Sequence, residues 1–85
     1  MKYYTRGETR EDAAEIPGKP LDPEDAAEAA AEHLFYHRDG WEIPFGEWPI
    51  TFTIVDDAGQ EWTCEVSRED APVFTSSEPK RKVVP

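Results

Sequence analysis

Apolar and polar residues alternate in two segments of the second half of the chain. In both segments an apolar side chain recurs at every second position, with polar residues, mostly threonine and glutamate, between them. A period of two is typical of strands that bury one face of a sheet and expose the other. The apolar positions are Ile50, Phe52, Ile54, Trp62, Cys64 and Val66. The pattern predicts a hairpin of two antiparallel strands.

The loop between these two strands sets their register. A three-residue loop, Asp57–Ala58–Gly59, places Ile54 opposite Trp62, whereas a loop one residue longer would set Ile54 against Glu61 on the same face. Three-residue hairpin loops favour a residue with positive φ at the last position, where Gly59 stands. We therefore predict the shorter loop. Its register pairs Ile50 with Val66, Phe52 with Cys64, and Ile54 with Trp62.

The stretch from residue 22 to residue 40 carries the signals of one helix, which we expect over residues 23–38. Asp22 is a good N-cap, Pro23 suits the first helical position, and Gly40 is placed to end the helix. At about 100° per residue, the small and apolar residues gather on one side. That side consists of Ala26, Ala27, Ala30, His33, Leu34 and His37. We expect it to pack on the sheet.

The remaining segments complete the predicted fold. The aromatic and β-branched content of Lys2–Arg6 predicts a first strand, and the glycines and prolines of residues 7–21 predict a loop. Residues 75–85 are polar, charged and proline-containing, which predicts a disordered basic tail. Residues 1–74 are then a single α+β domain with the order β-α-β-β. The expected architecture is a three-stranded antiparallel sheet with the helix packed on one face.

Three aromatic residues, Trp41, Phe45 and Trp48, stand among prolines and glycines between the helix and the hairpin. This composition predicts an ordered loop. One interpretation is that the three side chains cover the open end of a small core. The other is that at least one of them is exposed, in which case it belongs to a partner surface, because exposed apolar patches are usually functional.

Charge is distributed unevenly along the 85 residues. Residues 11–78 hold 18 of the 19 acidic residues and carry a net charge of −15, while Lys80, Arg81 and Lys82 make the C-terminal end basic. An acidic body repels DNA and RNA, so we expect no direct nucleic-acid ligand and favour a basic protein surface as the partner. The single cysteine and the lack of an apolar leader or membrane span favour a cytoplasmic protein.

Candidate catalytic and metal-binding residues are few. His33 and His37 have the spacing of two metal ligands on one helix face, but no further histidine or paired cysteine completes a tetrahedral site. Cys64 falls in the apolar set of its strand, where a small core residue is expected. A thiol enzyme would need one of the histidines beside it as a base. We expect no catalytic site, no metal and no cofactor.

Acidic residues recur at intervals of four along the predicted helix. Glu24, Glu28 and Glu32 form a row that Asp39 extends, and Phe35 projects at nearly the same angle. Like charges four residues apart repel each other, and a solvated face is the simplest explanation for such a row. The alternative is a binding face. Residues four apart advance about 6 Å along a helix, close to the phosphate spacing of a nucleic-acid strand, and an aromatic in a charged rim is typical of a binding hot spot.

The alanine-rich acidic helix followed by "DGWE", "WP", "FTIVDDAG" and "EV" resembles the small proteins encoded by bacteriophages and mobile elements. In size and acidity the chain resembles anti-CRISPR proteins, several of which occupy nucleic-acid-binding surfaces of the interference complex. The resemblance implies a non-enzymatic inhibitor whose acidic face mimics nucleic acid and binds such a complex or another nucleic-acid-handling protein. The resemblance assigns no residues; the acidic helix face described above supplies the predicted partner-binding residues Glu24, Glu28, Glu32 and Asp39, with Phe35 as the aromatic anchor. The alternative is an interaction module that uses the loop aromatics and needs its acids only for solubility.

Overall fold

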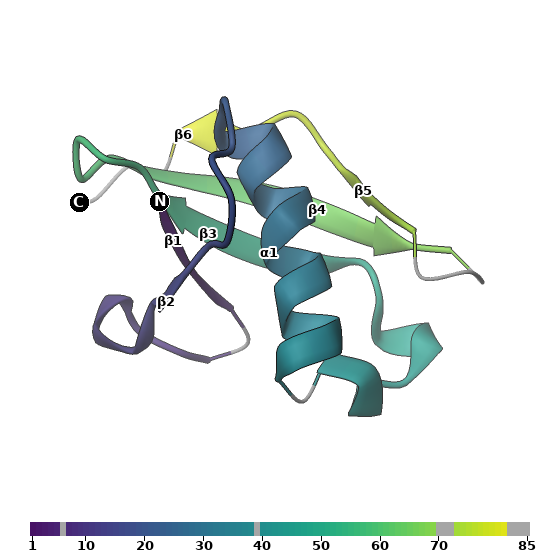
Figure 1. The fold of residues 1–85 in the computed structure, drawn as a ribbon. Coiled ribbons are helices and arrows are strands. Elements are labelled where there is room, and N and C mark those ends of the chain that lie inside the picture. Colours follow the sequence, from purple (N-terminus) through teal and green to yellow (C-terminus); the bar gives the residue numbers. More distant parts are fainter. Residues whose placement is uncertain (6, 39, 70–72, 82–85) are drawn as a thin grey trace.

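In the described part of the chain, the fold is one antiparallel sheet with one α-helix across one face (Figure 1). The computed structural model describes residues 1–5, 7–38, 40–69 and 73–81, without the side chain of Phe45. The strands are β1 (Lys2–Thr5), β2 (Ala14–Glu15), β3 (Ile50–Val55), β4 (Glu61–Arg68), β5 (Phe74–Ser76) and β6 (Lys80–Arg81), and the helix is α1 (Pro23–His37). Short 3-10 turns are η1 (Arg10–Asp12), η2 (Gly40–Glu42) and η3 (Phe45–Glu47). The prediction of an α+β fold with one helix is confirmed.

The prediction of a three-stranded sheet is wrong. The strand order is β2-β1-β3-β4-β5, and β6 also pairs with β4, so the described part of the sheet has six strands. The added strands are only two or three residues long, too short to show a period of two in the sequence. They form because β1 and β4 each offer an open row of backbone groups, and unpaired backbone groups at a sheet edge readily recruit another segment.

The segment after residue 73 runs along β4, where the sequence predicts a disordered tail from residue 75. Ser76 lies opposite Val66, and Lys80 lies opposite Thr63. Between these pairs the Glu65 amide donates to Ser77 Oγ at 2.9 Å, and the Ser77 amide donates to the Glu65 carbonyl at 2.8 Å. Backbone bonding of this kind needs no apolar side chains, so hydrophobicity gave no sign of it. Residues 82–85 of the expected tail lie outside the described residues.

The β3–β4 hairpin has the predicted register. Ile54 lies opposite Trp62, and the pairs Phe52 with Cys64 and Ile50 with Val66 follow. Asp56 accepts the 2.8 Å hydrogen bond of the Gln60 amide, and Gly59 has a φ of 83°. The Trp62 indole also donates to the Asp56 carboxylate at 3.0 Å, and this bond lowers the pKa of Asp56. A carboxylate that receives several N–H groups thus fixes the turn.

The core lies between the sheet and α1. Tyr3, Phe52, Ile54, Cys64 and Val66 are its largest fully buried side chains, all on the sheet face toward the helix. The helix contributes Ala26, Ala27, Ala30, Ala31 and Leu34. Alanine has a small side chain, so its backbone approaches the sheet closely. The helix begins as predicted, with the Asp22 carboxylate accepting from the Asp25 amide at 2.9 Å.

The opposite face of the sheet is covered at one end by η1. Arg10 of this turn donates to the Glu61 carboxylate at 3.4 Å and to the Gly59 carbonyl at 3.3 Å, and the Tyr4 hydroxyl also donates to Glu61. Glu65, one of the outward-facing residues of β4, is exposed on this side. Among the described residues, no helix is both long enough and apolar enough to cross a membrane.

Candidate functional site

The orientation of α1 decides which of its side chains a partner could reach. The buried residues Ala26, Ala27, Ala30, Ala31 and Leu34 define the inner side. It is rotated by roughly 30° from the side that the sequence predicts, at about 100° per residue. Ala31 therefore turns inward, and His37 is exposed. The residues opposite the buried set are Asp25, Glu32 and Tyr36, which we call the outward side of α1.

Glu28, a member of the predicted acidic row, is engaged within the fold. Its carboxylate accepts the backbone N–H of Ser76 in β5 at 3.0 Å, and its side chain is half-buried. A strand at the edge of a sheet exposes unpaired N–H groups that can pair with another chain. Glu28 bonds one of these groups and joins the helix to β5. The carboxylate of Glu28 therefore has a structural role within the chain.

Glu28→Ala should lower the free energy of unfolding by about 1–2 kcal/mol, because a partly buried N–H loses its hydrogen bond to a charged acceptor. Glu32→Ala is the matched control. It removes the same side chain from an exposed position one turn away and should change stability by about 0.5 kcal/mol or less. Urea denaturation of both variants measures the difference. Equal stability of the two would mean that the Ser76 bond contributes nothing to folding.

Phe35, the predicted aromatic anchor, lies on the same flank of α1 as Glu28. Its ring is 5.8 Å from the ring of Phe74 in β5, and the Arg68 guanidinium lies 4.7 Å from its centre. The side chain is partly buried and packs against the core. These contacts hold Phe35 in the seam between helix and sheet.

The other predicted binding residues do not lie together on one side of α1. Glu24 and Glu32 are exposed, on the flank and on the outward side of α1 respectively, and Asp39 lies outside the described residues. With Glu28 bonded to β5, the three glutamates do not form one row of free carboxylates. The structure instead brings Glu32 beside Tyr36, which is 59% exposed. The sequence prediction missed Tyr36, although its position four residues after Glu32 was a usable signal.

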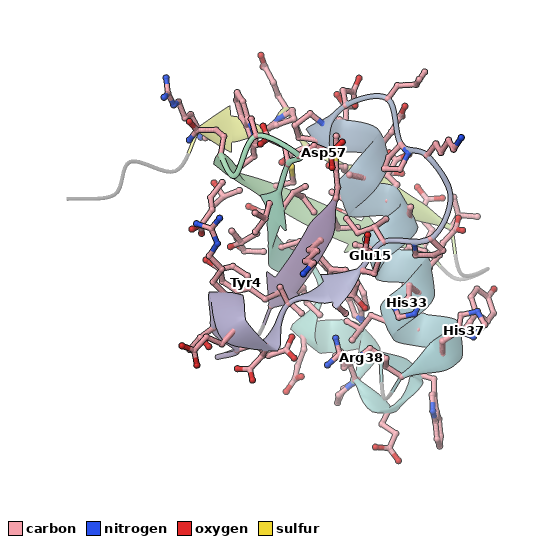
Figure 2. All side chains as sticks on the ribbon, turned by 60° about the vertical axis from the view of Figure 1, so that its left-hand side comes forward. Tyr4, Glu15, His33, His37, Arg38 and Asp57 are labelled. Atoms are coloured by element: carbon pink, nitrogen blue, oxygen red, sulfur yellow. The ribbon has the colours of Figure 1, made fainter. Side chains whose placement is uncertain are left out.

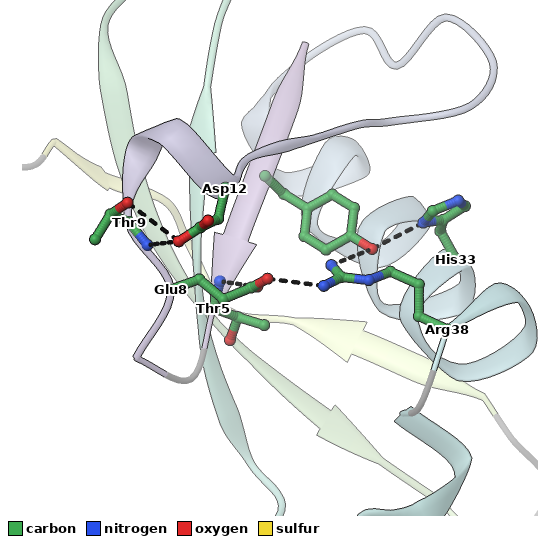
Figure 3. A network of polar contacts seen from close by, with 7 residues as sticks. Thr5, Glu8, Thr9, Asp12, His33 and Arg38 are labelled. Atoms are coloured by element: carbon green, nitrogen blue, oxygen red, sulfur yellow. Dashed lines mark hydrogen bonds and ion pairs between the residues drawn. The ribbon is translucent and has the colours of Figure 1, made fainter.

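The other flank of α1 is joined to β1 by a polar network (Figure 3). The buried Tyr3 hydroxyl lies 2.8 Å from His33 Nδ1, and Arg38 Nη1 donates to the same oxygen at 3.4 Å. Arg38 also forms an ion pair with Glu8 at 2.7 Å, and Glu8 accepts the Thr5 amide at 3.1 Å. Hydrogen bonds to Glu8 and Tyr3 raise the pKa of Arg38. Burial, assisted by the charges of His37 and Arg38, lowers the pKa of His33. Its imidazole is therefore uncharged near neutral pH.

The histidine pair does not have the surroundings of a metal site. The rings of His33 and His37 stack with centres 5.4 Å apart at the C-terminal half of α1 (Figure 2). One ring nitrogen of His33 is already bonded to Tyr3. Among the described residues, no three histidine, cysteine, aspartate or glutamate side chains are grouped so that they could hold a metal ion.

Cys64 and the histidines lie at different ends of the helix. The thiol is 1% exposed and lies 3.7 Å from the carbonyl of Pro23, at the start of α1. His33 is ten residues further along the helix, about 15 Å away at 1.5 Å per residue. Burial raises the pKa of the Cys64 thiol, which disfavours the reactive thiolate. The structure therefore does not form the cysteine–histidine pair that a thiol enzyme would need.

The loop aromatics are separated by the fold. Trp48 is 8% exposed, and its ring lies 5.4 Å from that of Phe74, so it covers the core. Trp41 is 62% exposed in η2, just beyond the end of α1. The side chain of Phe45 lies outside the described residues. Trp48 thus covers the core as the first interpretation predicts, while Trp41 is the exposed aromatic that a partner could reach.

A shallow open groove follows α1 on the side of the histidines. It has a volume of about 310 Å³ and lies between Pro17–Gly18, in the loop before the helix, and the side chains of the helix itself. The helix side chains that line it are Ala29, Glu32, His33, Tyr36 and His37. The groove is therefore continuous with the outward side of α1. It combines one carboxylate with three flat rings.

Comparisons of the chain with family models, curated proteins and solved structures found no significant match.

Proposed function

We propose that this protein binds a partner protein. The outward side of α1, together with Glu24 and Trp41, docks on a basic surface of that partner. The observation that carries the proposal is the exposure of Tyr36 beside Glu32 on the side of α1 away from the core. Large aromatics inside a charged rim are typical of binding hot spots. The net charge of −10 favours a partner of opposite sign, since complementary charge steers encounter.

The partner class that the charge favours is a protein that handles nucleic acid, because such proteins present Lys- and Arg-rich grooves for phosphates. An inhibitor of the anti-CRISPR kind, acting on an interference complex, is one form of this proposal and stays a prediction. Mimicry of a phosphate row has less support than docking by a mixed surface, because Glu28 is bonded to Ser76. We propose neither direct binding of nucleic acid nor a role in catalysis.

The test is capture of partners from a lysate of the organism that carries the gene. The immobilised protein is compared with a variant that combines Asp25→Asn and Glu32→Lys. A matched control combines Glu65→Gln and Glu11→Lys, which changes the charge equally at two exposed residues away from α1. The first variant should lose captured proteins by about tenfold, and the control should retain them, because only the first changes the docking surface.

Added salt should weaken capture by the wild-type protein, and double-stranded DNA should compete with it if the partner surface is one that binds nucleic acid. Equal capture by the wild-type protein and the Asp25, Glu32 variant would remove the proposal. Glu28 is kept unchanged in every variant, because its substitution would also disturb the fold.

A second candidate function rests on Trp41 alone. In an interaction module of this kind the exposed indole is the anchor, and the acidic residues serve only solubility. Trp41→Ala should then abolish capture, while salt and the acidic substitutions should have little effect. The two candidates thus differ in their response to salt: only the first predicts that added salt weakens capture.

A further inference from the structure

We infer that the groove between Pro17–Gly18 and α1 receives an arginine side chain of the partner protein. The inference rests on the proposed function and specifies the recognition that it would use. A volume of about 310 Å³ lies at the lower end of the range for small-ligand sites, about 300–1,000 Å³. A groove of this size, open to solvent on one side, accommodates a single protruding side chain.

The lining of the groove has the chemistry that a guanidinium group requires. Glu32 supplies a carboxylate, and Tyr36 supplies an exposed aromatic ring on the same helix. The stacked imidazoles of His33 and His37 add a flat surface, their planes inclined by 30°. A guanidinium is planar, pairs with carboxylates through two N–H groups and stacks on aromatic faces, whereas an ammonium is a strongly hydrated point charge.

The charges near the groove are compatible with a cationic guest. The adjacent cation, Arg38, is neutralised by its ion pair with Glu8 at 2.7 Å. Lys19 follows Gly18 in the chain but does not line the groove. His33 remains uncharged near neutral pH, for the reasons given above. Among the described residues that line the groove, Glu32 is the one that carries a negative charge.

The Tyr3–His33 hydrogen bond gives the groove a fixed wall. Tyr3 is fully buried in the central part of the sheet, and its hydroxyl holds the His33 ring at 2.8 Å. The Arg38 contact to the same hydroxyl fixes the end of the helix beside it. Side chains held in this way lose little conformational entropy when a guest binds, and such preorganisation favours affinity.

The experiment measures binding of two fluorescent peptides of equal charge, nona-arginine and nona-lysine, by fluorescence anisotropy at physiological salt. Nona-arginine should bind more tightly. Glu32→Gln and Tyr36→Leu should each weaken its binding by roughly threefold, the size of one exposed ion pair or cation–π contact. Tyr36→Phe should bind as the wild-type protein does, because the ring is retained. Glu11→Gln is the control for charge, since it removes one carboxylate from η1.

Two outcomes would overturn the inference. One is equal weakening by Glu32→Gln and Glu11→Gln, which would mean that the peptide senses only overall charge. The other is that nona-lysine binds as tightly as nona-arginine and that the Tyr36 variants change the binding of both peptides equally. In both cases an acidic docking surface could still bind a basic partner. If the wild-type protein captured no partner in the lysate experiment, in contrast, the proposed function itself would be removed.

Discussion

Gly40→Ala should destabilise the protein by about 3 kcal/mol, at the upper end of what added methyl groups cost in a packed core. A Cβ at this position would lie 2.7 Å from the backbone carbon and oxygen of Leu34 and 2.8 Å from its Cγ. Two of these atoms belong to the backbone of α1, so no side-chain rotation relieves the overlap. The end of the helix or η2 would have to move.

Thermal denaturation followed by circular dichroism measures the effect. At about 4–8 °C per kcal/mol for a domain of this size, the melting temperature should fall by roughly 12–24 °C. Gly46→Ala is the matched control, because a Cβ there meets no atom within 4 Å and Gly46 is not among the glycines with positive φ. A Gly40 variant as stable as the Gly46 variant would refute the close contact.

Tyr3→Ala should cost about 3–5 kcal/mol, the range for truncating a large buried aromatic side chain. Tyr3 is fully buried, lies opposite Ile54, and packs with its ring centre 5.9 Å from that of Phe52. The substitution leaves a cavity beneath α1. It also removes the hydroxyl that His33 and Arg38 contact.

Urea denaturation separates these two contributions. Tyr3→Phe retains the ring and should lose only about 1–2 kcal/mol, because the bonded hydroxyl alone is removed. Tyr36→Ala is the matched control on the helix surface and should change stability by about 0.5 kcal/mol or less. A Tyr3→Ala variant with the stability of Tyr36→Ala would show that β1 is not part of the folded core.

The contrast between Tyr3 and Tyr36 also makes the binding experiments interpretable. Tyr36 lies on the outward side of α1, so its substitutions change the docking surface and leave the core intact. Glu32 shares this property. Glu28 and Phe35 do not, because β5 holds both of them. A loss of binding in a Glu28 variant would therefore have two explanations, whereas a loss in a Glu32 variant has one.

Local sequence determined the helix and the hairpin. The alternation in β3 and β4, with Gly59 in the loop, allowed only one register that keeps Ile54 and Trp62 together, and the structure has that register. Asp22 and Pro23 likewise fixed the start of α1. These signals are readable because they depend on residues close in the chain: turn geometry, capping and a periodic apolar face.

Tertiary structure alone decided the three short strands β2, β5 and β6 and the side of α1 that stays exposed. β2, β5 and β6 are held by backbone hydrogen bonds to the edges of β1 and β4, and such bonds place no demand on side-chain type. The roles of Glu28 and Phe35 follow from β5, which lies against one flank of the helix. Gly40 was expected to end the helix. The structure gives a second reason for glycine at this position, because a Cβ there would overlap with Leu34. The candidate site on Glu32 and Tyr36 emerged only after these long-range contacts had fixed the rotation of the helix on the sheet.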